Sequence, residues 1–293
     1  MQRVPLAATA RASAGEPAAL PALGPLPAAS DNPALPKNEQ QPSPQCLQRV
    51  QRDLAEFARH PPPGVFIEPE KEDITTIHAI IVGPDGTPYE GGFFHFVLKL
   101  PPDYPVEPPL VRFMTTDGGR VGFNPNLHAD GKVCLSFPRP PWSAALSLEC
   151  VLVSVQSLLN EDPSANQPVF GPFGQWIGRL RGYKDNLRYQ TLRVAVCDAV
   201  QACLLGTAPY PTTLREAVLA RFAENYAKYE NAVGDTPVTS LLGSVLGASN
   251  VEYEKCQGLL ERVRDLYGRI LKTQVLQTGN RDSARTRLSA LSP

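Results

Sequence analysis

The sequence predicts an α+β fold in which one helix precedes an antiparallel β-meander and several helices follow it. Three observations support this prediction. Apolar residues recur at helical spacing before residue 60, β-branched and aromatic runs follow between residues 75 and 115, and amphipathic stretches occupy the chain after residue 147. This order of helix, sheet and then helices is typical of α+β domains.

The first helix is expected to begin near Cys46. Arg49 and Arg52 fall on its polar face, opposite the apolar stripe. Prolines at positions 61–63 end the helix, because proline lacks the backbone N–H and clashes with the preceding turn. The apolar stripe consists of Leu47, Val50, Leu54 and Phe57.

Three strands are expected, over residues 75–82, 93–100 and 110–115. A Gly-Pro-Asp-Gly turn at residues 83–86 closes the first of them. The proline-rich stretch at residues 101–109 forms a rigid crossing, since prolines interrupt pairing in a central strand. The short connections favour antiparallel neighbours.

The later helices are expected over residues 147–161, 186–205, 214–232 and 251–272. The last one has an apolar stripe that is too small to form a core by itself, and the helix before it has a matching apolar face. We therefore expect these two helices to pack on each other and on the helix that ends at residue 205. The stripe is Leu259, Val263, Leu266 and Ile270, and the matching face is Phe222, Tyr226 and Tyr229.

Composition divides the chain into four parts. Residues 1–44 are rich in Ala and Pro and are expected to be a disordered tail. The absence of acids before Glu16 would suit an organelle transit peptide, but the proline density opposes the amphipathic helix that such a peptide needs. A core domain is expected over residues 45–205, a helical extension over 206–272 and a flexible tail over 273–293.

Charge and cysteine usage exclude several classes of protein. The net charge is −1, without the basic surplus of a nucleic-acid binder, and no apolar run reaches the roughly 18 residues of a membrane span. The six cysteines form no Cys-x-x-Cys pair, and the four histidines fit no zinc-ligand spacing. We expect reduced thiols, no metal, and a cytoplasmic or nuclear protein.

The stretch that is most informative about chemistry runs from Gly122 to Ser136. Asn124-Pro125-Asn126 is turn chemistry, and an Asp-Gly turn separates it from Cys134. The loop would fold the Asn126 amide back over the sulfur, where the amide would donate to an oxyanion during acyl transfer. A cysteine suits a thioester carrier, because its thiolate is both a good nucleophile and a good leaving group.

Each of these residues also has a plain structural interpretation. A cysteine between Val133 and Leu135 is commonly a small buried core residue, and Asn126 would serve equally to cap a turn. No His–Asp pair near Cys134 in the sequence completes a protease-like triad. Spacing alone leaves both interpretations open.

From Leu47 to Leu205 the chain resembles the ubiquitin-conjugating enzyme family in five ordered motifs. Asn-Pro-Asn-Leu combined with Lys-Val-Cys-Leu-Ser is similar to a subgroup of large conjugating enzymes. The motifs are Gly-Pro at 83–84 with Tyr-Glu-Gly-Gly at 89–92, the prolines at 100–109, Asn-Pro-Asn at 124–126, Gly-Lys-Val-Cys-Leu at 131–135, and Trp-Ser-Ala-Ala-Leu at 142–146.

The resemblance implies the ubiquitin-conjugating fold, with a four-stranded meander, and a transferase activity. Cys134 would accept ubiquitin or a ubiquitin-like modifier from an activating enzyme as a glycyl thioester, and a substrate lysine would then attack, usually with a ligase. Asn126 would stabilise the oxyanion or hold the loop. No cofactor is implied for this chain, because the activating enzyme uses the ATP.

The resemblance also implies two sets of residues around the nucleophile. The supporting residues are Asn124, Pro125, Trp142, Ser136 and Gln167. The residues expected to bind partners are Arg49, Arg52, Val106, Ala144 and Ala145, of which the two arginines would face an acidic surface of the activating enzyme.

Departures from the family pattern bear on lysine activation and ligase choice. Asn124 replaces the histidine of His-Pro-Asn, so that the hydrogen bonds of that histidine must be remade. Ser136 and Gln167 stand where acids often line the lysine channel. Ala144 replaces a proline, Val106 stands where some members have phenylalanine, and the subgroup's usual insertion between the cysteine and the tryptophan is missing.

Two alternatives accompany the acyl-carrier interpretation. A catalytically dead binding module of the same fold would present ubiquitin or hold a partner, but such a module needs neither Cys134 nor Asn126. The second alternative keeps the enzyme and changes the cargo, since the sequence does not separate ubiquitin from its relatives.

Overall fold

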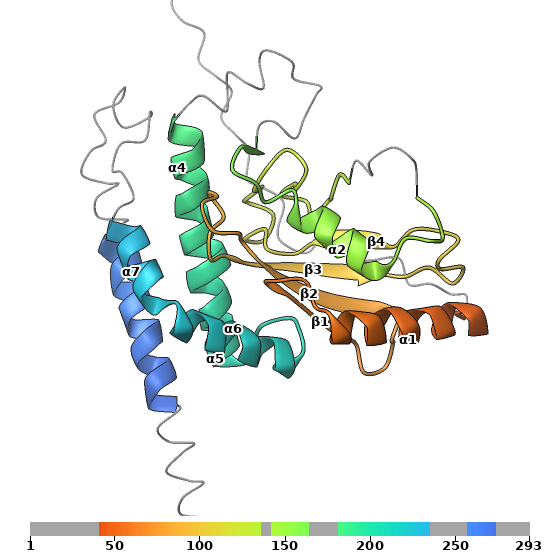
Figure 1. Cartoon of the computed structure of the whole chain (residues 1–293). Coiled ribbons are helices and arrows are strands. Elements are labelled where there is room, and N and C mark those ends of the chain that lie inside the picture. The colour runs from red at the N-terminus through yellow and green to blue at the C-terminus, as the bar shows by residue number, and fades with distance from the viewer. Residues whose placement is uncertain (1–40, 136–141, 164–180, 235–256, 274–293) are drawn as a thin grey trace, which may run out of the picture. The chain divides into compact units, whose positions relative to one another are not determined.

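The sheet has four antiparallel strands in the order β1-β2-β3-β4, which confirms the meander (Figure 1). The computed structural model describes residues 41–135, 142–163, 181–234 and 257–273. Three strands lie where the sequence predicts them: β2 (Thr76–Val82), β3 (Phe93–Lys99) and β4 (Leu110–Phe113). The pattern did not identify β1 (Val65–Pro69), because it is only five residues long and follows directly on the prolines that end the first helix.

Both faces of the sheet are covered, which explains why β2 and β3 are buried almost throughout and mostly apolar. Successive side chains of a strand point to opposite faces of the sheet. Alternate residues of β2 and β3 therefore belong to separate clusters. Ile77, Ala79 and Ile81 join the first cluster, whereas Ile80 joins the second. On the partner strand, Phe93 belongs to the second cluster. A sheet buried on both sides has near-continuous hydrophobic strands.

The first cluster packs the sheet against α1 (Pro44–Arg59) and α2 (Leu148–Gln156). Serine side chains cap both helices, since Ser43 accepts from the N–H of Cys46 and Ser147 from that of Cys150. The predicted helix over residues 147–161 is too long, because the chain leaves helical hydrogen bonding after Gln156 and enters a turn. The aromatic centre of the cluster is Tyr89, Phe94, Phe96, Phe113 and Phe123.

One long helix, green in Figure 1, comprises α4 (Arg181–Gln190), η3 (Thr191–Asp198) and α5 (Ala199–Leu205). Its described part includes five residues before the predicted start at residue 186, since residues 181–185 are already helical. Its middle segment η3 is a π-helix, in which the hydrogen-bonding pattern widens by one residue. The helix ends at Gly206, which adopts the left-handed conformation with φ of 71°.

The helical extension contains α6 (Thr212–Glu224), α7 (Tyr226–Gly234) and a helix over residues 257–273. The predicted single helix over residues 214–232 is wrong in one respect, since it breaks at Asn225. The N–H of Asn225 reaches the carbonyls of Arg221 and Phe222, and its side-chain amide also donates to Arg221. Competing local hydrogen bonds of this kind make asparagine a helix terminator.

The second cluster joins the extension to the far face of the sheet, as the apolar stripe predicts. All four stripe residues are at most 4% exposed. Tyr229 also reaches the core, where its hydroxyl donates to the carbonyl oxygen of Gly91 at 2.9 Å. The cluster contains Ile80, Phe93, Leu192, Val196, Val200, Leu214, Val218, Phe222, Tyr229, Leu259, Val263, Leu266 and Ile270, among others.

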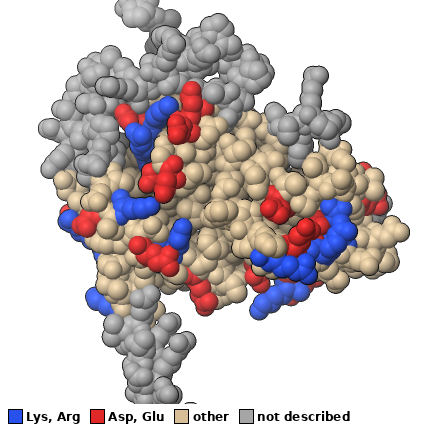
Figure 2. All heavy atoms as spheres, viewed as in Figure 1, with Lys and Arg blue, Asp and Glu red and all other residues tan. Residues whose placement is uncertain are grey.

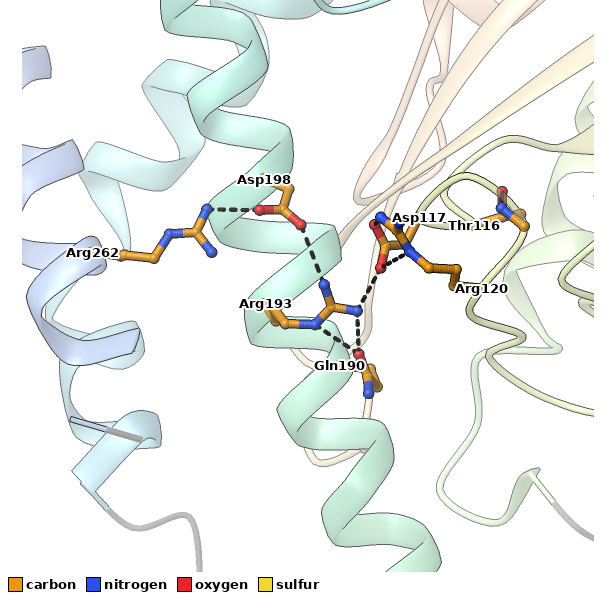
Figure 3. A network of polar contacts seen from close by, with 8 residues as sticks. Thr116, Asp117, Arg120, Gln190, Arg193, Asp198 and Arg262 are labelled. Atoms are coloured by element: carbon orange, nitrogen blue, oxygen red, sulfur yellow. Dashed lines mark hydrogen bonds and ion pairs between the residues drawn. The ribbon is translucent and has the colours of Figure 1, made fainter. Parts of the chain in front are cut away.

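A chain of ion pairs ties the helix over residues 257–273 to the loop after β4 (Figure 3). Arg262 donates to Asp198 at 2.6 Å, and Arg193 from the same π-helical segment as Asp198 donates to Asp117 at 2.7 Å. Arg120 and Arg193 hold the pKa of Asp117 below its usual value. Asp117 has φ of 53°, so that these arginines stabilise a residue in the left-handed region.

All described residues belong to one compact unit, which spans residues 32–293. The predicted disordered tail reaches the described part of the chain only at its last four residues, 41–44. The predicted C-terminal tail lies outside the described residues except for Thr273, as do residues 251–256 of the last predicted helix.

Candidate active site

A small hairpin carries the predicted nucleophile. Leu127 and Val133 are antiparallel partners across it, and the N–H of His128 donates to the carbonyl oxygen of Lys132 at 3.0 Å. Gly131 closes the turn with φ of 86°, and a Cβ there would lie 2.8 Å from the carbonyl oxygen of Phe113. Glycine is required here because it adopts a positive φ without strain and has no Cβ to clash with that oxygen. We call residues 122–134 the site segment.

The pairing of the hairpin sorts its side chains onto two faces. Leu127 is fully buried in the first cluster, and Val133 packs against the same cluster. Successive side chains in paired extended strands point to opposite faces. Asn126, His128 and Cys134 therefore share the other face with the exposed Lys132.

Asn126 and Cys134 are joined by two hydrogen bonds. The N–H of Cys134 donates to the carbonyl oxygen of Asn126 at 2.9 Å, and the Asn126 amide donates to the carbonyl oxygen of Cys134 at 2.8 Å. The amide thus folds back as predicted, but it binds the backbone of Cys134. This is the geometry of a residue that holds the loop, and oxyanion stabilisation stays a prediction.

Asn124 makes the hydrogen bonds that organise the start of the site segment. Its Oδ1 accepts the N–H groups of Asn126 at 2.7 Å and Leu127 at 3.0 Å, and its Nδ2 donates to the carbonyl oxygen of Leu158 at 3.0 Å. An asparagine thus supplies both an acceptor and a donor here. Pro125, partly buried, lies between the two asparagines.

Cys134 differs in exposure from most of the other described cysteines. It is partly exposed, whereas Cys46, Cys197 and Cys203 are buried. Burial raises the pKa of the Cys197 thiol to about 11 and also raises the pKa of Cys203. Buried thiols of this kind are poor nucleophiles. Cys150 is exposed as well, so exposure alone does not identify the nucleophile.

His128 is the residue of the site that sequence reasoning missed. Its Nε2 lies 3.5 Å from Sγ of Cys134. His128 fits neither a zinc-ligand spacing nor the pattern of a protease-like triad. The overlooked signal is the Asp-Gly turn, because a hairpin closed at residues 129–131 brings positions 128 and 134 together on one face.

Trp142 connects the two loops that carry predicted partner-binding residues. Its Nε1 donates to the carbonyl oxygen of Pro105 at 2.9 Å, next to Val106, which is 74% exposed. Ala144 and Ala145 are exposed on the loop that follows Trp142. The structure therefore brings these three small apolar residues onto two adjoining loops.

Arg49 does not lie on a free polar face, and this expectation is wrong. Its side chain is 11% exposed, and it bonds Asp53 at 2.7 Å. It also donates to the carbonyl oxygens of Ala144 and Leu146, both at 2.7 Å. Arg49 therefore holds the loop that was expected to bind a partner, because the fold brings carbonyl acceptors over this side of α1. Arg52 is exposed, and its role in docking stays a prediction.

Asp53 is a second residue whose importance the sequence did not reveal. It lies in α1 at 4% exposure and accepts from Arg49, from the Tyr104 hydroxyl at 2.5 Å and from the N–H of Leu148 at 3.4 Å. Burial and the neighbouring Asp53 carboxylate raise the pKa of Tyr104. One carboxylate thus joins α1, the proline-rich crossing and the N-terminus of α2.

Acidic and basic side chains are intermixed on the face shown in Figure 2. The described residues of this face therefore create no large field of one sign to steer a partner. Among the described residues, no group of three or more His, Cys, Asp or Glu side chains could hold a metal ion. No described helix is long and apolar enough to cross a membrane. Ser136 and Gln167 lie outside the described residues.

Comparison with known proteins identifies a family. The family model described as "Ubiquitin-conjugating enzyme" matches residues 49–188. Human "Ubiquitin-conjugating enzyme E2 Z" is 46% identical over 197 residues, which cover 66% of this chain and 54% of that protein. The zebrafish protein of the same name (Danio rerio) is 41% identical over 222 residues, or 74% of this chain and 66% of that protein.

A relative with a different name matches a shorter stretch. "Ubiquitin-conjugating enzyme E2 S" of Branchiostoma floridae is 39% identical over 117 residues, covering 40% of this chain and 53% of that protein. The chain thus spans between about half and two thirds of the length of these curated relatives. The matches agree with the resemblance to the subgroup of large conjugating enzymes.

Proposed function

Because this chain belongs to the ubiquitin-conjugating enzyme family, we propose that it carries ubiquitin, or a ubiquitin-like modifier, as a thioester on Cys134. The single observation that supports this most directly is the placement of Cys134. Cys134 is a partly exposed residue at the end of a hairpin whose conformation Asn124 and Asn126 maintain. A nucleophile that must meet two large protein partners needs access from solvent and a defined direction of attack.

The proposed reaction has two steps of acyl transfer. In loading, the Cys134 sulfur attacks the modifier's thioester on an activating enzyme, and the activating enzyme's thiolate leaves. In discharge, a lysine amine of a substrate protein attacks the new thioester, and the Cys134 thiolate leaves. No redox change occurs, and this chain needs no cofactor, since ATP is consumed upstream by the activating enzyme.

We also propose that the chain binds a ubiquitin ligase. The proposed docking surface consists of two adjoining loops, one with Val106 and the other with Ala144 and Ala145. Two features support this surface. Its apolar residues are exposed, and the loops are rigidly held, one through Trp142 and the other through Arg49. A rigid surface loses less entropy on binding than a flexible one.

A charging assay tests the proposed function. The full chain is incubated with ATP and a panel of activating enzymes and modifiers, and adducts are separated on gels with and without reductant. We expect one adduct that reductant removes. Cys134→Ser should give a slower, thiol-resistant oxyester, because an alkoxide leaves far less readily than a thiolate. Cys134→Ala should give none.

The matched control is Cys150→Ser, which removes the other exposed thiol among the described residues and should charge normally. Normal charging of Cys134→Ala would refute the proposed nucleophile. An uncharged wild-type chain that still binds modifier would favour the binding-module alternative, and the partner that charges it identifies the cargo.

A further inference from the structure

The face of the hairpin that bears Cys134 also bears the His128 imidazole, whose hydrogen-bond partner among the described residues is the Cys134 sulfur. Leu127 and Val133 fill the core, and Asn124 and Asn126 maintain the loop. The backbone of His128 closes the turn through its N–H and its carbonyl oxygen. Its side chain is not needed for that turn and points instead toward the sulfur, with Nε2 at 3.5 Å from Sγ.

Other described groups of the hairpin are less suited than His128 to accept a proton from the sulfur. Within the described part of the chain, Nε2 of His128 is the one polar side-chain atom within hydrogen-bond distance of Sγ. The Asn126 amide is not a base, and it is already bonded to the carbonyl oxygen of Cys134. Lys132 is an exposed cation, and the Asp130 carboxylate accepts the N–H of Lys132.

We propose that His128 is a catalytic residue, the proton acceptor for both acyl-transfer steps at Cys134; this inference rests on the proposed function. In loading, the Cys134 S–H proton passes to Nε2 while the sulfur forms a bond to the thioester carbonyl carbon. The bond from that carbon to the activating enzyme's sulfur then breaks, and this leaving thiolate takes up the proton.

In discharge, the thioester sulfur no longer carries a proton, and Nε2 faces the reacting carbonyl. The lysine nitrogen forms a bond to the carbonyl carbon, and its proton passes to Nε2. The bond from carbon to the Cys134 sulfur then breaks. Cys134 leaves as a thiolate and recovers a proton from the imidazolium, which returns both residues to their starting state.

The turn geometry favours this role. The short hairpin fixes the separation of positions 128 and 134 through the backbone bonds on both sides of the turn, so that the imidazole is preorganised before a substrate arrives. The charged groups around it are Lys132 across the hairpin, Asp130 in the turn, and Arg112 of β4, whose Nη2 donates to the carbonyl oxygen of Asp130 at 3.3 Å.

The test measures single-turnover discharge of loaded enzyme to free lysine at several pH values. The variants are His128→Gln, which keeps a polar side chain that does not titrate, and His128→Ala, which opens space for added imidazole. We expect discharge of both to slow by about 100-fold, a typical contribution of general acid–base catalysis. Added imidazole should restore most of the rate of His128→Ala.

The pH dependence separates a proton acceptor from a structural residue. The ratio of the wild-type rate to the His128→Gln rate should fall as the pH is lowered and the imidazole takes up a proton. A structural role predicts a ratio that is constant with pH and no rescue by imidazole, and this result would overturn the proposal. His60→Gln, on the exposed cap of α1, is the matched control and should discharge normally.

The two proposals fail in distinguishable ways. Absence of any reducible adduct on wild-type Cys134 would end the proposed function. Normal loading followed by equally fast discharge of His128→Gln and wild type would end only the role of His128. Circular dichroism of each variant checks that the domain is folded. If His128→Ala does not fold, the pH-dependent ratio for His128→Gln decides the question.

Discussion

The two faces of the sheet are held together in different ways. On the first face, the site segment is fastened by hydrogen bonds from Asn124, Asn126 and the Gly131 turn, and only a few apolar side chains anchor it. On the second face, the helical extension is attached mainly through the apolar side chains of the second cluster.

This difference separates chemistry from stability. Apolar burial is nondirectional and stabilises the whole unit, whereas hydrogen bonds fix the position of individual atoms. A change on the second face should therefore act mainly on unfolding, and a change in the site segment mainly on catalysis. Three predictions test this division, from the largest expected effect to the smallest.

The largest effect is expected from Phe222→Ala in the second cluster. Phe222 is fully buried and stacks on Tyr229 at a centroid distance of 5.0 Å. Removal of a buried phenylalanine ring typically costs about 3–5 kcal/mol in the free energy of unfolding. Urea unfolding should show this loss, while the discharge rate per folded molecule stays unchanged.

Leu205→Ala is the control for Phe222→Ala. Leu205 is 58% exposed, and its truncation should change the free energy of unfolding by no more than about 0.5 kcal/mol. Equal losses in the two variants, or a discharge rate that falls with Phe222→Ala, would break the division between the faces.

The next effect is expected from Asn126→Ala in the site segment. Loss of one preorganised donor costs about 2.7–4 kcal/mol of transition-state stabilisation, so discharge should slow by roughly 100-fold or more. Loading should suffer less, because a thiolate needs less help than an amine. Single-turnover loading and discharge rates measure the two steps separately.

The structure sharpens the alternative for Asn126. Its amide bonds the carbonyl oxygen of Cys134, so a purely loop-holding residue predicts equal losses in loading and discharge. Asn225→Ala, which removes an amide that bonds the end of α6, is the control and should leave both rates unchanged.

The smallest effect is expected from pH on the second face. His95 lies on β3, where its Nε2 is 3.0 Å from Nδ1 of His78, and its ring packs against Tyr210. Burial and His78 lower the pKa of His95 to about 3. An unfolded histidine has a pKa of about 6.5, so below that pH the unfolded chain binds a proton that folded His95 does not.

Stability should accordingly be full above about pH 6.5 and fall as the pH decreases toward the folded pKa. Between about pH 6.5 and 5 the loss should be about 2 kcal/mol, at about 1.4 kcal/mol per unit. Urea unfolding at several pH values measures the slope. Lys99 and threonine hydroxyls lower the pKa of Asp73. The effect of Asp73 on stability therefore falls at lower pH and does not overlap the range between about pH 6.5 and 5 in which His95 acts. A flat profile would contradict the assignment, and the control His60→Gln should keep the slope.

Turn chemistry and helical periodicity were readable from the sequence because both act over a few residues. The Asp-Gly turn, the Asn-Pro-Asn bend and the stripe from Leu259 to Ile270 all appear where the pattern predicts them. The predicted secondary structure was wrong where a local hydrogen bond or the pairing of strands overrode the periodic pattern. Asn225 breaks a periodic helix, and β1 forms because its neighbour β2 offers a free edge.

By itself, the sequence determined the order of helix, meander and helices and the apolar faces of the extension, since periodicity and turn propensity are local properties. The candidate nucleophile came from the resemblance of the motifs around Cys134 to a family. Tertiary structure decided which partners the polar side chains found. It directed Arg49 to the carbonyls of another loop and buried Asp53 among three elements. Such contacts depend on how distant segments pack, and a contact between residues almost a hundred positions apart leaves no periodic signal in one sequence.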